Sequence, residues 1–406
     1  MVSSLVMLAI MAGCAVYLFL KGTLAQGIAM IFNAIVAGFI AFGFYEMLSE
    51  FLIKYSPGIA VWANLICFSL LFILAFAILQ TVAMQLNKEK VDFGKLPEQV
   101  GRPMMGIVLG YIITGHLLIA VAMAPLPSQW PYPRFDERNP NPASPSKALL
   151  SPDGFVAGLF GTVSKGSFTP FGEARSFAVL HAGYVDQLYL NRQKVTQDVS
   201  IVTSAPAVAA PRKDGVWFAR DGLRDSEGKA LPAPPGESLM LVRIAIRRSA
   251  LKDAAKFTLS QLRLICSPKT GEGPLAGAGR AVYPIGYIGS GGRLERKSLA
   301  EIITVDSSKV EGDVSMDVAF FVPTNLTPAL VAFKRNNIVQ VSSPASPEDA
   351  PQPLPFGASA PASQAAPSPE PRSEPASTPP TSDERREGSG LSDFSRSIVG
   401  DGLEEN

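Results

Sequence analysis

The stretch from Val2 to Leu20 reads VSSLVMLAIMAGCAVYLFL and contains no charged residue. A helix needs about 20 residues of this kind to cross the hydrocarbon core of a bilayer, so the stretch predicts a first membrane span. A cleaved signal peptide is the competing interpretation, but no basic residue precedes the apolar run, and the run is long for such a peptide. We therefore expect a membrane protein.

Three further apolar stretches extend this pattern. They run from Ile28 to Met47, from Ile59 to Met84 and from Gly101 to Met123, after which Pro125 and Pro127 stop the last helix. Only 17% of the 406 residues are charged, against about 25% in soluble domains. The sequence therefore predicts a multi-domain membrane protein that begins with a four-helix transmembrane bundle over residues 1–126.

The basic residues beside the spans predict their orientation, because Lys and Arg gather on the cytoplasmic side of a membrane. The connection between spans one and two and the connection between spans three and four lie on the same side of the membrane, and that side carries five basic residues. The opposite side carries three. The three are Lys54, Arg134 and Arg138, and the five are Lys21, Lys88, Lys90, Lys95 and Arg102. The count predicts that both termini lie outside the cytoplasm and that the chain after Met123 is exported.

The chain after the spans changes its pattern several times. Phe155, Leu159 and Val163 recur at four-residue steps, which is typical of a short amphipathic helix. Val314 to Val322 alternates as a strand with one buried face does. We expect a Pro-rich aromatic spacer (127–146), an amphipathic helical segment (147–204), a hinge (205–213), an immunoglobulin-like β-sandwich (214–341) and a disordered acidic Pro/Ala/Ser-rich tail (342–406).

The β-sandwich prediction rests on several short strands separated by turn residues. The other strand candidates are Leu239–Arg247, Phe257–Ile265, Val282–Ile288 and Ile302–Val305. The tail has 11 acidic and 4 basic residues and few that could form a core, so it is predicted to stay disordered. The region between the spans and the tail is basic, and it can bind anionic lipid, wall polymers or the chain's own tail.

Composition and motifs exclude several classes of function. With 36 basic and 35 acidic residues, the chain lacks the basic excess of a nucleic-acid binder. Cys14, Cys67 and Cys266 lie far apart, so neither a structural zinc site nor a disulfide framework is expected. No phosphate loop, zinc-protease helix or nucleophile elbow occurs. We expect no catalytic residue, metal or cofactor, and an enzyme is the least supported class.

Polar residues within or beside the spans are the candidate functional residues, because such residues are costly in lipid. They are His116, Arg102, Asn33 and Asn64. They predict either a proton or solute path or interhelical hydrogen bonds that fix packing. Packing is the preferred interpretation, because no carboxylate lies in the central part of a span to complete a relay. On the exported helices, His181, Tyr184, Asp186 and Arg192 form a polar group that we expect to be a solvated face.

Small residues at four-residue spacing are the candidates for helix packing. Gly106 and Gly110 form a GxxxG motif in the fourth span, and Ala34 and Gly38 form a similar pair in the second. Small residues at this spacing let two helix backbones approach closely. Packing within the bundle is the preferred interpretation, and self-association into a homo-oligomer is the alternative.

Two stretches of the N-terminal third resemble a known family. Leu20 to Gln26 reads LKGTLAQ, and Leu96 to Gly110 reads LPEQVGRPMMGIVLG. Both resemble the colicin V production protein family of bacterial inner-membrane proteins, over about Met1 to Leu126. The resemblance implies a multi-pass protein that is needed to produce or export a toxin and is linked to envelope maintenance.

A second resemblance concerns Met316 to Phe333, which is similar to the closing strands of immunoglobulin-like domains in exported bacterial proteins. Such domains bind partners or act as spacers. The sequence as a whole predicts a non-enzymatic scaffold or accessory factor that contacts the lipid bilayer and protein partners in the envelope. The alternative is a small transport or channel subunit with a polar path through the helix bundle.

Overall fold

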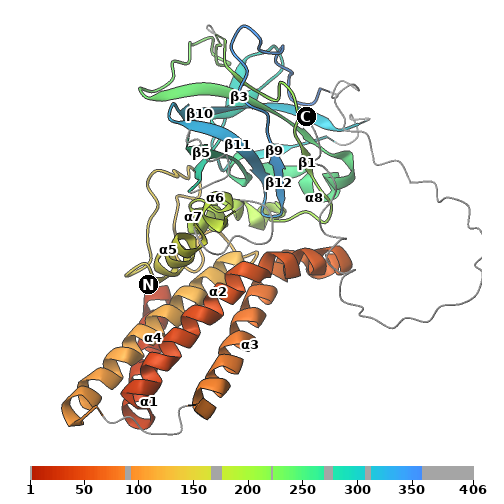
Figure 1. Cartoon of the computed structure of the whole chain (residues 1–406). Helices are drawn as coiled ribbons and strands as arrows, with labels where there is room; N and C mark the ends of the chain where they lie inside the picture. Colours follow the sequence, from red (N-terminus) through yellow and green to blue (C-terminus); the bar gives the residue numbers. More distant parts are fainter. Residues whose placement is uncertain are drawn as a thin grey trace, which may run out of the picture. The chain divides into compact units, whose positions relative to one another are not determined.

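Four long helices form the N-terminal part of the computed structural model, which describes residues 2–86, 93–165, 176–220, 223–268, 278–306 and 312–358 (Figure 1). Within these ranges, four helices are long and apolar enough to cross a membrane. The helices are α1 (Val2–Lys21), α2 (Leu24–Tyr55), α3 (Ala63–Leu86) and α4 (Lys95–Met123), with a 3₁₀ turn η1 (Pro57–Trp62) before α3. The predicted four-helix membrane region is confirmed.

Local sequence explains where α2 and α4 begin. The Thr23 hydroxyl accepts a hydrogen bond from the Gln26 amide at 3.2 Å, and the Gln26 side chain accepts one from the Thr23 amide at 3.1 Å, which is a capping box. Helix α4 begins at Lys95, six residues before the predicted Gly101, because its first turn tolerates Pro97 and favours the acidic Glu98. Lys88 and Lys90 lie outside the described residues.

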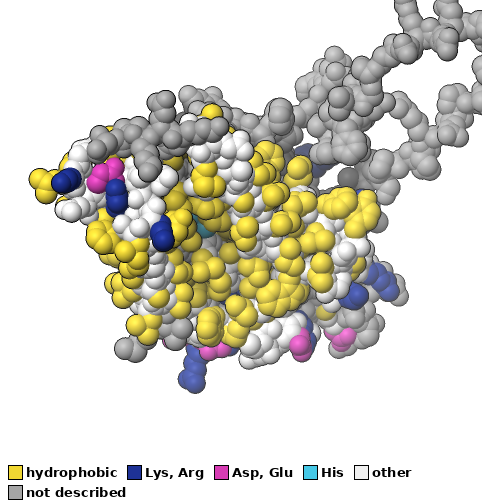
Figure 2. Space-filling model, turned by 90° about the horizontal axis from the view of Figure 1, so that it is seen from below, with side chains coloured by type: hydrophobic (Ala, Val, Ile, Leu, Met, Phe, Trp, Pro, Cys, Tyr) yellow, Lys and Arg dark blue, Asp and Glu magenta, His cyan; other side chains and the backbone are white. Residues whose placement is uncertain are grey.

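The bundle is held together mainly by two helix pairs, α1 with α4 and α2 with α3. A Cβ added to Gly106 would lie 2.4 Å from the Cα of Ala15, and one added to Gly110 would lie 2.6 Å from the Cα of Met11. These glycines therefore let α1 and α4 approach to backbone contact. Seen from below, the bundle presents mostly hydrophobic side chains, with the charged ones towards the edge of the view (Figure 2).

A helical layer follows the bundle and packs on its end. It consists of α5 (Pro152–Ser164), α6 (Phe177–Leu180), α7 (Tyr184–Asn191) and a short turn η2 (Val195–Gln197). Val156, Phe160 and Leu188 of this layer share one hydrophobic cluster with Phe42 of α2. Tyr132 and Phe135, in the region predicted to be a Pro-rich aromatic spacer, are buried in the same cluster.

Two antiparallel sheets form the C-terminal part, and their facing residues enclose one hydrophobic core. Among the described residues, the larger sheet has the order β1-β3-β10-β7-β8 with β2 on β3, and the smaller has the order β12-β11-β5-β6. A separate pair joins β4 to β9. The predicted β-sandwich is confirmed. The strands are β1 (Val208–Ala209), β2 (Val216–Phe218), β3 (Glu237–Ile246), β4 (Lys256–Thr258), β5 (Leu262–Pro268), β6 (Arg280–Val282), β7 (Gly286–Ile288), β8 (Leu294–Arg296), β9 (Ile302–Thr304), β10 (Val314–Pro323), β11 (Leu326–Phe333) and β12 (Asn337–Gln340).

Small helical turns connect some strands of this region. They are η3 (Arg248–Ala250), α8 (Leu251–Ala254) and η4 (Leu259–Gln261). The strand predicted at Val314–Val322 is β10, which pairs along its whole length with β3. Strand β10 therefore forms the centre of the larger sheet.

A proline-rich strap, residues 345–358, covers the outer face of the larger sheet. Ala345 pairs with β2, and the carboxylate of Asp317 on β10 accepts a hydrogen bond from the Leu354 amide at 2.6 Å. Ala350 is buried against Trp217 and Leu241. The ordered sandwich thus extends past residue 341, where we expected the tail to begin, and residues 359–406 lie outside the described part of the chain.

Candidate functional site

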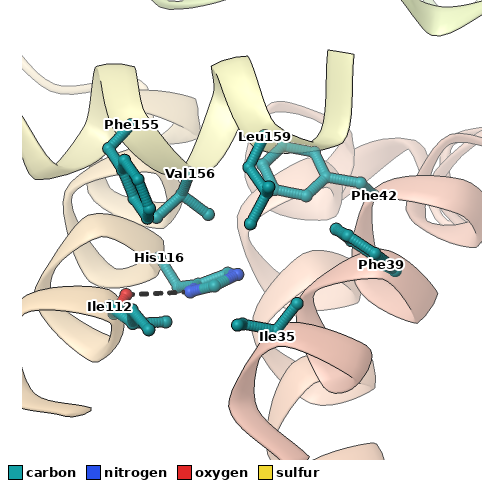
Figure 3. A pocket seen from close by; sticks show the side chains of 8 residues that line it. All are labelled: Ile35, Phe39, Phe42, Ile112, His116, Phe155, Val156 and Leu159. Atoms are coloured by element: carbon teal, nitrogen blue, oxygen red, sulfur yellow. Dashed lines mark hydrogen bonds between the residues drawn. The ribbon is translucent and has the colours of Figure 1, made fainter. Parts of the chain in front are cut away.

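His116 lies near the C-terminal end of α4, beside α2 and α5 (Figure 3). Its Nδ1 donates a hydrogen bond to the Ile112 carbonyl at 2.9 Å. Its Nε2 has no hydrogen-bond partner among the described residues, and a Cβ added to Gly38 would lie 2.1 Å from it. The small cavity beside the ring is lined otherwise by apolar residues of α2, α4 and α5: Ile35, Phe39, Phe42, Ile112, Phe155, Val156 and Leu159. Gly38 therefore makes room for the imidazole of His116.

The other candidate residues of the spans bond elsewhere. Asn33 donates to Gln80 of α3 at 3.1 Å, and Asn64 accepts from Ser49 of α2 at 3.0 Å. Arg102 forms an ion pair with Glu98 at 2.5 Å within α4. The structure brings none of these three groups to His116, whose ring stacks on Phe72 with centroids 4.4 Å apart. Asn33 and Asn64 each bond across the contact between α2 and α3, whereas Arg102 bonds within its own helix.

A polar cluster, which we call the junction and in which all members but the half-exposed Glu46 are buried, lies where α2, α6, α7 and the β11–β12 turn meet. It consists of Tyr45, Glu46, His181, Tyr184 and Arg335. The Tyr184 hydroxyl donates to the Tyr45 hydroxyl at 2.9 Å, and Tyr45 donates to a Glu46 carboxylate oxygen at 2.7 Å. The same Glu46 oxygen lies 2.9 Å from Nε2 of His181. The junction therefore connects a membrane helix directly to the helical layer.

Arg335 connects the sandwich to the same place. Its guanidinium donates to the carbonyl of Met123, the last residue of α4, at 3.0 Å. The final carbonyls of a helix have no partner within the helix and carry partial negative charge, so a buried cation is favourable there. Burial raises the pKa of the Tyr184 phenol, and the charge of Arg335 opposes this shift. A turn of the sandwich thus caps a membrane helix.

A second buried network holds the segment after α4 against α7. Arg134 forms an ion pair with Asp186 at 2.6 Å and donates to the Tyr132 hydroxyl at 2.8 Å. The Tyr132 hydroxyl in turn donates to Asp153 of α5. Burial raises the pKa of Asp186, and the neighbouring Arg134 opposes this shift. The network fixes residues that we expected to form an extended spacer.

Two arginines of this region are buried more deeply. Arg192 is 1% exposed, its guanidinium lies 4.5 Å from the centre of the Tyr189 ring, and burial lowers its pKa to about 10. Arg263 of β5 is 3% exposed, and none of its side-chain nitrogens has a hydrogen-bond partner among the described residues. Burial lowers the pKa of Arg263, against the opposing effects of Tyr283 and then Glu46. Arg263 is therefore an unpaired buried group beside the junction.

Replacing Arg263 by methionine is expected to leave the free energy of unfolding unchanged or to raise it by about 1–3 kcal/mol. A buried polar group without a partner is costly, and an apolar side chain of similar length removes that cost. Urea unfolding of the full chain in lipid nanodiscs measures the difference. The matched control is Arg243→Met, which removes a paired buried arginine and should destabilise. A clear loss of stability in Arg263→Met would show that Arg263 has an anionic partner in solution.

Sequence reasoning missed most of the junction. His181, Tyr184 and Arg192 were expected on a solvated face, but all three are buried, so that expectation is wrong. The cause is that the helical layer is covered on both sides, by α2 on one and by the smaller sheet on the other. Among the described residues there is also no group of three His, Cys, Asp or Glu side chains that could hold a metal ion.

A comparison with known families bears on the membrane helices and the residues that follow them. Residues 3–136 match the family model described as Colicin V production protein. The Colicin V production protein match covers all four spans and includes Tyr132 and Arg134, so the predicted resemblance is confirmed. It does not cover the helical layer or the sandwich. The family is not known for enzymatic activity. No curated protein and no solved structure matches the chain.

Proposed function

We propose that this protein is a non-enzymatic scaffold or accessory factor of the bacterial inner membrane, which acts in toxin production or export or in envelope maintenance. In this proposal both termini lie outside the cytoplasm, and the exported β-sandwich binds protein partners of the envelope. The Colicin V production protein match supports the membrane role, and the excess of basic residues on one side of the spans supports the orientation.

The observation that carries the proposal is the junction. Arg335 and Met123 are 212 residues apart, and Tyr184 and Tyr45 are 139 apart, yet each pair forms a buried hydrogen bond. These contacts fix the sandwich to the end of α4 and the helical layer to α2, rather than leaving them on a flexible tether. A domain held at a set position above the membrane suits the display of a binding surface to partners.

The polar-path alternative has less support. His116 is enclosed by aromatic rings, and the polar groups of Asn33, Asn64 and Arg102 bond to separate partners. A proton or solute path needs polar groups that follow one another through the bundle. Packing of the helices accounts for these residues without such a path.

A complementation experiment tests the scaffold proposal. A strain that lacks the gene should lose toxin export or resistance to detergent, and the wild-type chain should restore it. The double variant Arg335→Met with Tyr45→Phe loosens the junction, so it should insert at normal levels and fail to restore the phenotype. The variant His116→Gln, at the same protein level, should restore it, because no polar path is required.

Two controls accompany this experiment. Limited proteolysis should show that the sandwich of the double variant is still folded. A periplasm-active and a cytoplasm-active reporter, each fused after Asn406 of the full chain, should give signal only from the periplasmic one. Full restoration by the double variant, or signal only from the cytoplasmic reporter, would contradict the proposal. Failure of His116→Gln alone would favour the transport alternative.

A further inference from the structure

Helix α5 and the turn before it form an apolar stretch outside the four spans. Residues 148–164 read ALLSPDGFVAGLFGTVS and contain one charged residue, Asp153, between the flanking Lys147 and Lys165. The helix has 13 residues, which is too short to cross a bilayer but is a length found in buried core helices and in re-entrant membrane segments. Its position against the spans decides between these two.

The start of α5 lies beside α4 rather than beyond its end. The Tyr111 hydroxyl of α4 donates to the Leu150 carbonyl at 2.9 Å. A Cβ added to Gly115 of α4 would lie 2.5 Å from the carbonyl oxygen of Pro152. Tyr111 and Gly115 precede Met123, the last residue of α4, by about 18 and 12 Å along the helix. The first turn of α5 therefore contacts α4 well before that helix ends.

The charged groups at the other end of α4 fix the depth of these contacts. Glu98 forms an ion pair with Arg102 and accepts a hydrogen bond from the Leu24 amide at 3.1 Å. Charges are costly in lipid, so this end of α4 lies at a membrane surface. The hydrocarbon core is about 30 Å thick and takes in roughly the 20 residues of α4 that follow Arg102. Tyr111 and Gly115 are the ninth and thirteenth of these residues, so the start of α5 lies at membrane depth.

Contacts with α2 give the same depth. The Phe160 ring of α5 lies 5.7 Å from the Phe39 ring of α2, measured between ring centres. Leu159 points from α5 into the cavity that Ile35 of α2 also lines (Figure 3). Ile35 and Phe39 lie well inside residues 28–47, the apolar stretch that predicts the second span. Helix α5 therefore packs against the middle of two spans.

Polar groups at the start of α5 bond within the protein. Leu150 and Ser151 have left-handed backbone angles, with φ of 59° and 45°, and the Ser151 amide donates to the Ala148 carbonyl at 2.9 Å. Irregular backbone is tolerated at membrane depth where the protein satisfies its polar groups. Asp153 is 1% exposed, and its carboxylate accepts a hydrogen bond from Tyr132. A buried and bonded carboxylate is also the form in which an acidic residue is tolerated there.

The outward side chains of this segment are large and apolar. Leu149, Leu150 and Phe155 are 48%, 65% and 47% exposed on the protein surface. We propose that residues 149–159 form a re-entrant segment that dips into the bilayer beside α4 and places these three side chains against lipid acyl chains. Contact with acyl chains removes their apolar surface from water. The proposal depends neither on which side of the membrane the sandwich faces nor on the proposed function.

Fluorescence quenching tests the proposal on the full chain in lipid nanodiscs, whose two faces are both open to water. An environment-sensitive fluorophore is attached to Phe155→Cys in a Cys14→Ser background, in which the remaining native thiols, Cys67 and Cys266, are buried. We expect iodide in the water to quench it at least about fivefold less than at a water-facing position, because the hydrocarbon layer excludes water. A phospholipid with a nitroxide on its acyl chain should quench it strongly. Leu150→Cys repeats the measurement at a second position.

Two control positions have nearly the same exposure as Phe155. Ile107→Cys on α4, at 45%, is the lipid-facing control, and Glu301→Cys in the sandwich, at 46% for the side chain, is the water-facing control. Thermal unfolding verifies that each labelled variant is folded. Iodide quenching of Phe155→Cys equal to that of Glu301→Cys would place α5 above the membrane and overturn the proposal. Protection from both quenchers would assign this face to a second copy of the chain and would also overturn it.

Discussion

Replacing Asp317 by alanine should lower the free energy of unfolding of the sandwich by about 3–5 kcal/mol. Asp317 is 0% exposed, and its carboxylate holds the Arg243 guanidinium through two bonds of 2.7 and 2.8 Å. The two residues lie opposite each other on β10 and β3. Without Asp317, a buried guanidinium loses its charge partner, and the Leu354 amide of the strap loses its acceptor. The strap should therefore detach as well.

The measurement is urea unfolding of the full chain in nanodiscs, followed by tryptophan fluorescence. Trp217 reports on this site, because the Arg243 guanidinium lies 5.1 Å from its ring centre. The double variant Asp317→Leu with Arg243→Met should recover most of the loss, since an apolar pair leaves no uncompensated charge. The exposed pair Lys297 and Glu301 offers a matched control, and Glu301→Ala should cost less than about 1 kcal/mol. An effect of Asp317→Ala as small as that of Glu301→Ala would show that the buried pair is not essential.

The sequence predicts the membrane helices well because their signal is local. Each span needs only a run of apolar residues, and that run does not depend on which neighbour the helix meets. The boundaries were less accurate. Helix α4 begins at Lys95 rather than Gly101, since a helix can extend through polar residues once it has left the lipid.

The sequence predicted where several strands lie, but it gave no prediction of which strands pair. The stretch Phe257–Ile265 contains two strands, because the turn η4 divides β4 from β5, and these pair in different sheets. The stretch Val282–Ile288 is divided into β6 and β7, where Pro284 cannot donate to a ladder. An alternating pattern predicts an extended chain, but it carries no information about which strand lies beside it.

The junction was the least predictable part, because residues far apart in the sequence make it up. Tyr45 comes from a membrane helix, Tyr184 from α7 and Arg335 from a turn, and no motif joins them. One local signal was present. In β5 the residues Leu262, Leu264 and Cys266 face the core, so Arg263 and Ser267 occupy a second buried face. Polar residues at alternate positions of an otherwise apolar strand can therefore indicate a buried interface.

Replacing Gly106 by leucine should lower the free energy of unfolding of the membrane bundle by about 3 kcal/mol or more. A Cβ at this position would lie 2.4 Å from the Cα of Ala15 and 2.6 Å from the carbonyl oxygen of Cys14. Both contacts are with backbone atoms, which cannot move aside as a side chain can, so α1 and α4 must separate. Thermal unfolding in detergent micelles, at equal protein and detergent concentrations, measures the loss.

The control is Gly13→Leu, because a Cβ on Gly13 of α1 meets nothing within 4 Å. It adds the same side chain to the same helix pair and should change stability by less than about 0.5 kcal/mol. The comparison also separates packing within the bundle from self-association. If Gly106 served an oligomer interface, leucine would dissociate the oligomer and leave the monomer as stable as the wild type. Because Gly106 already contacts α1 of its own chain, we expect the monomer itself to lose stability. We expect no dissociation of an oligomer before the monomer unfolds.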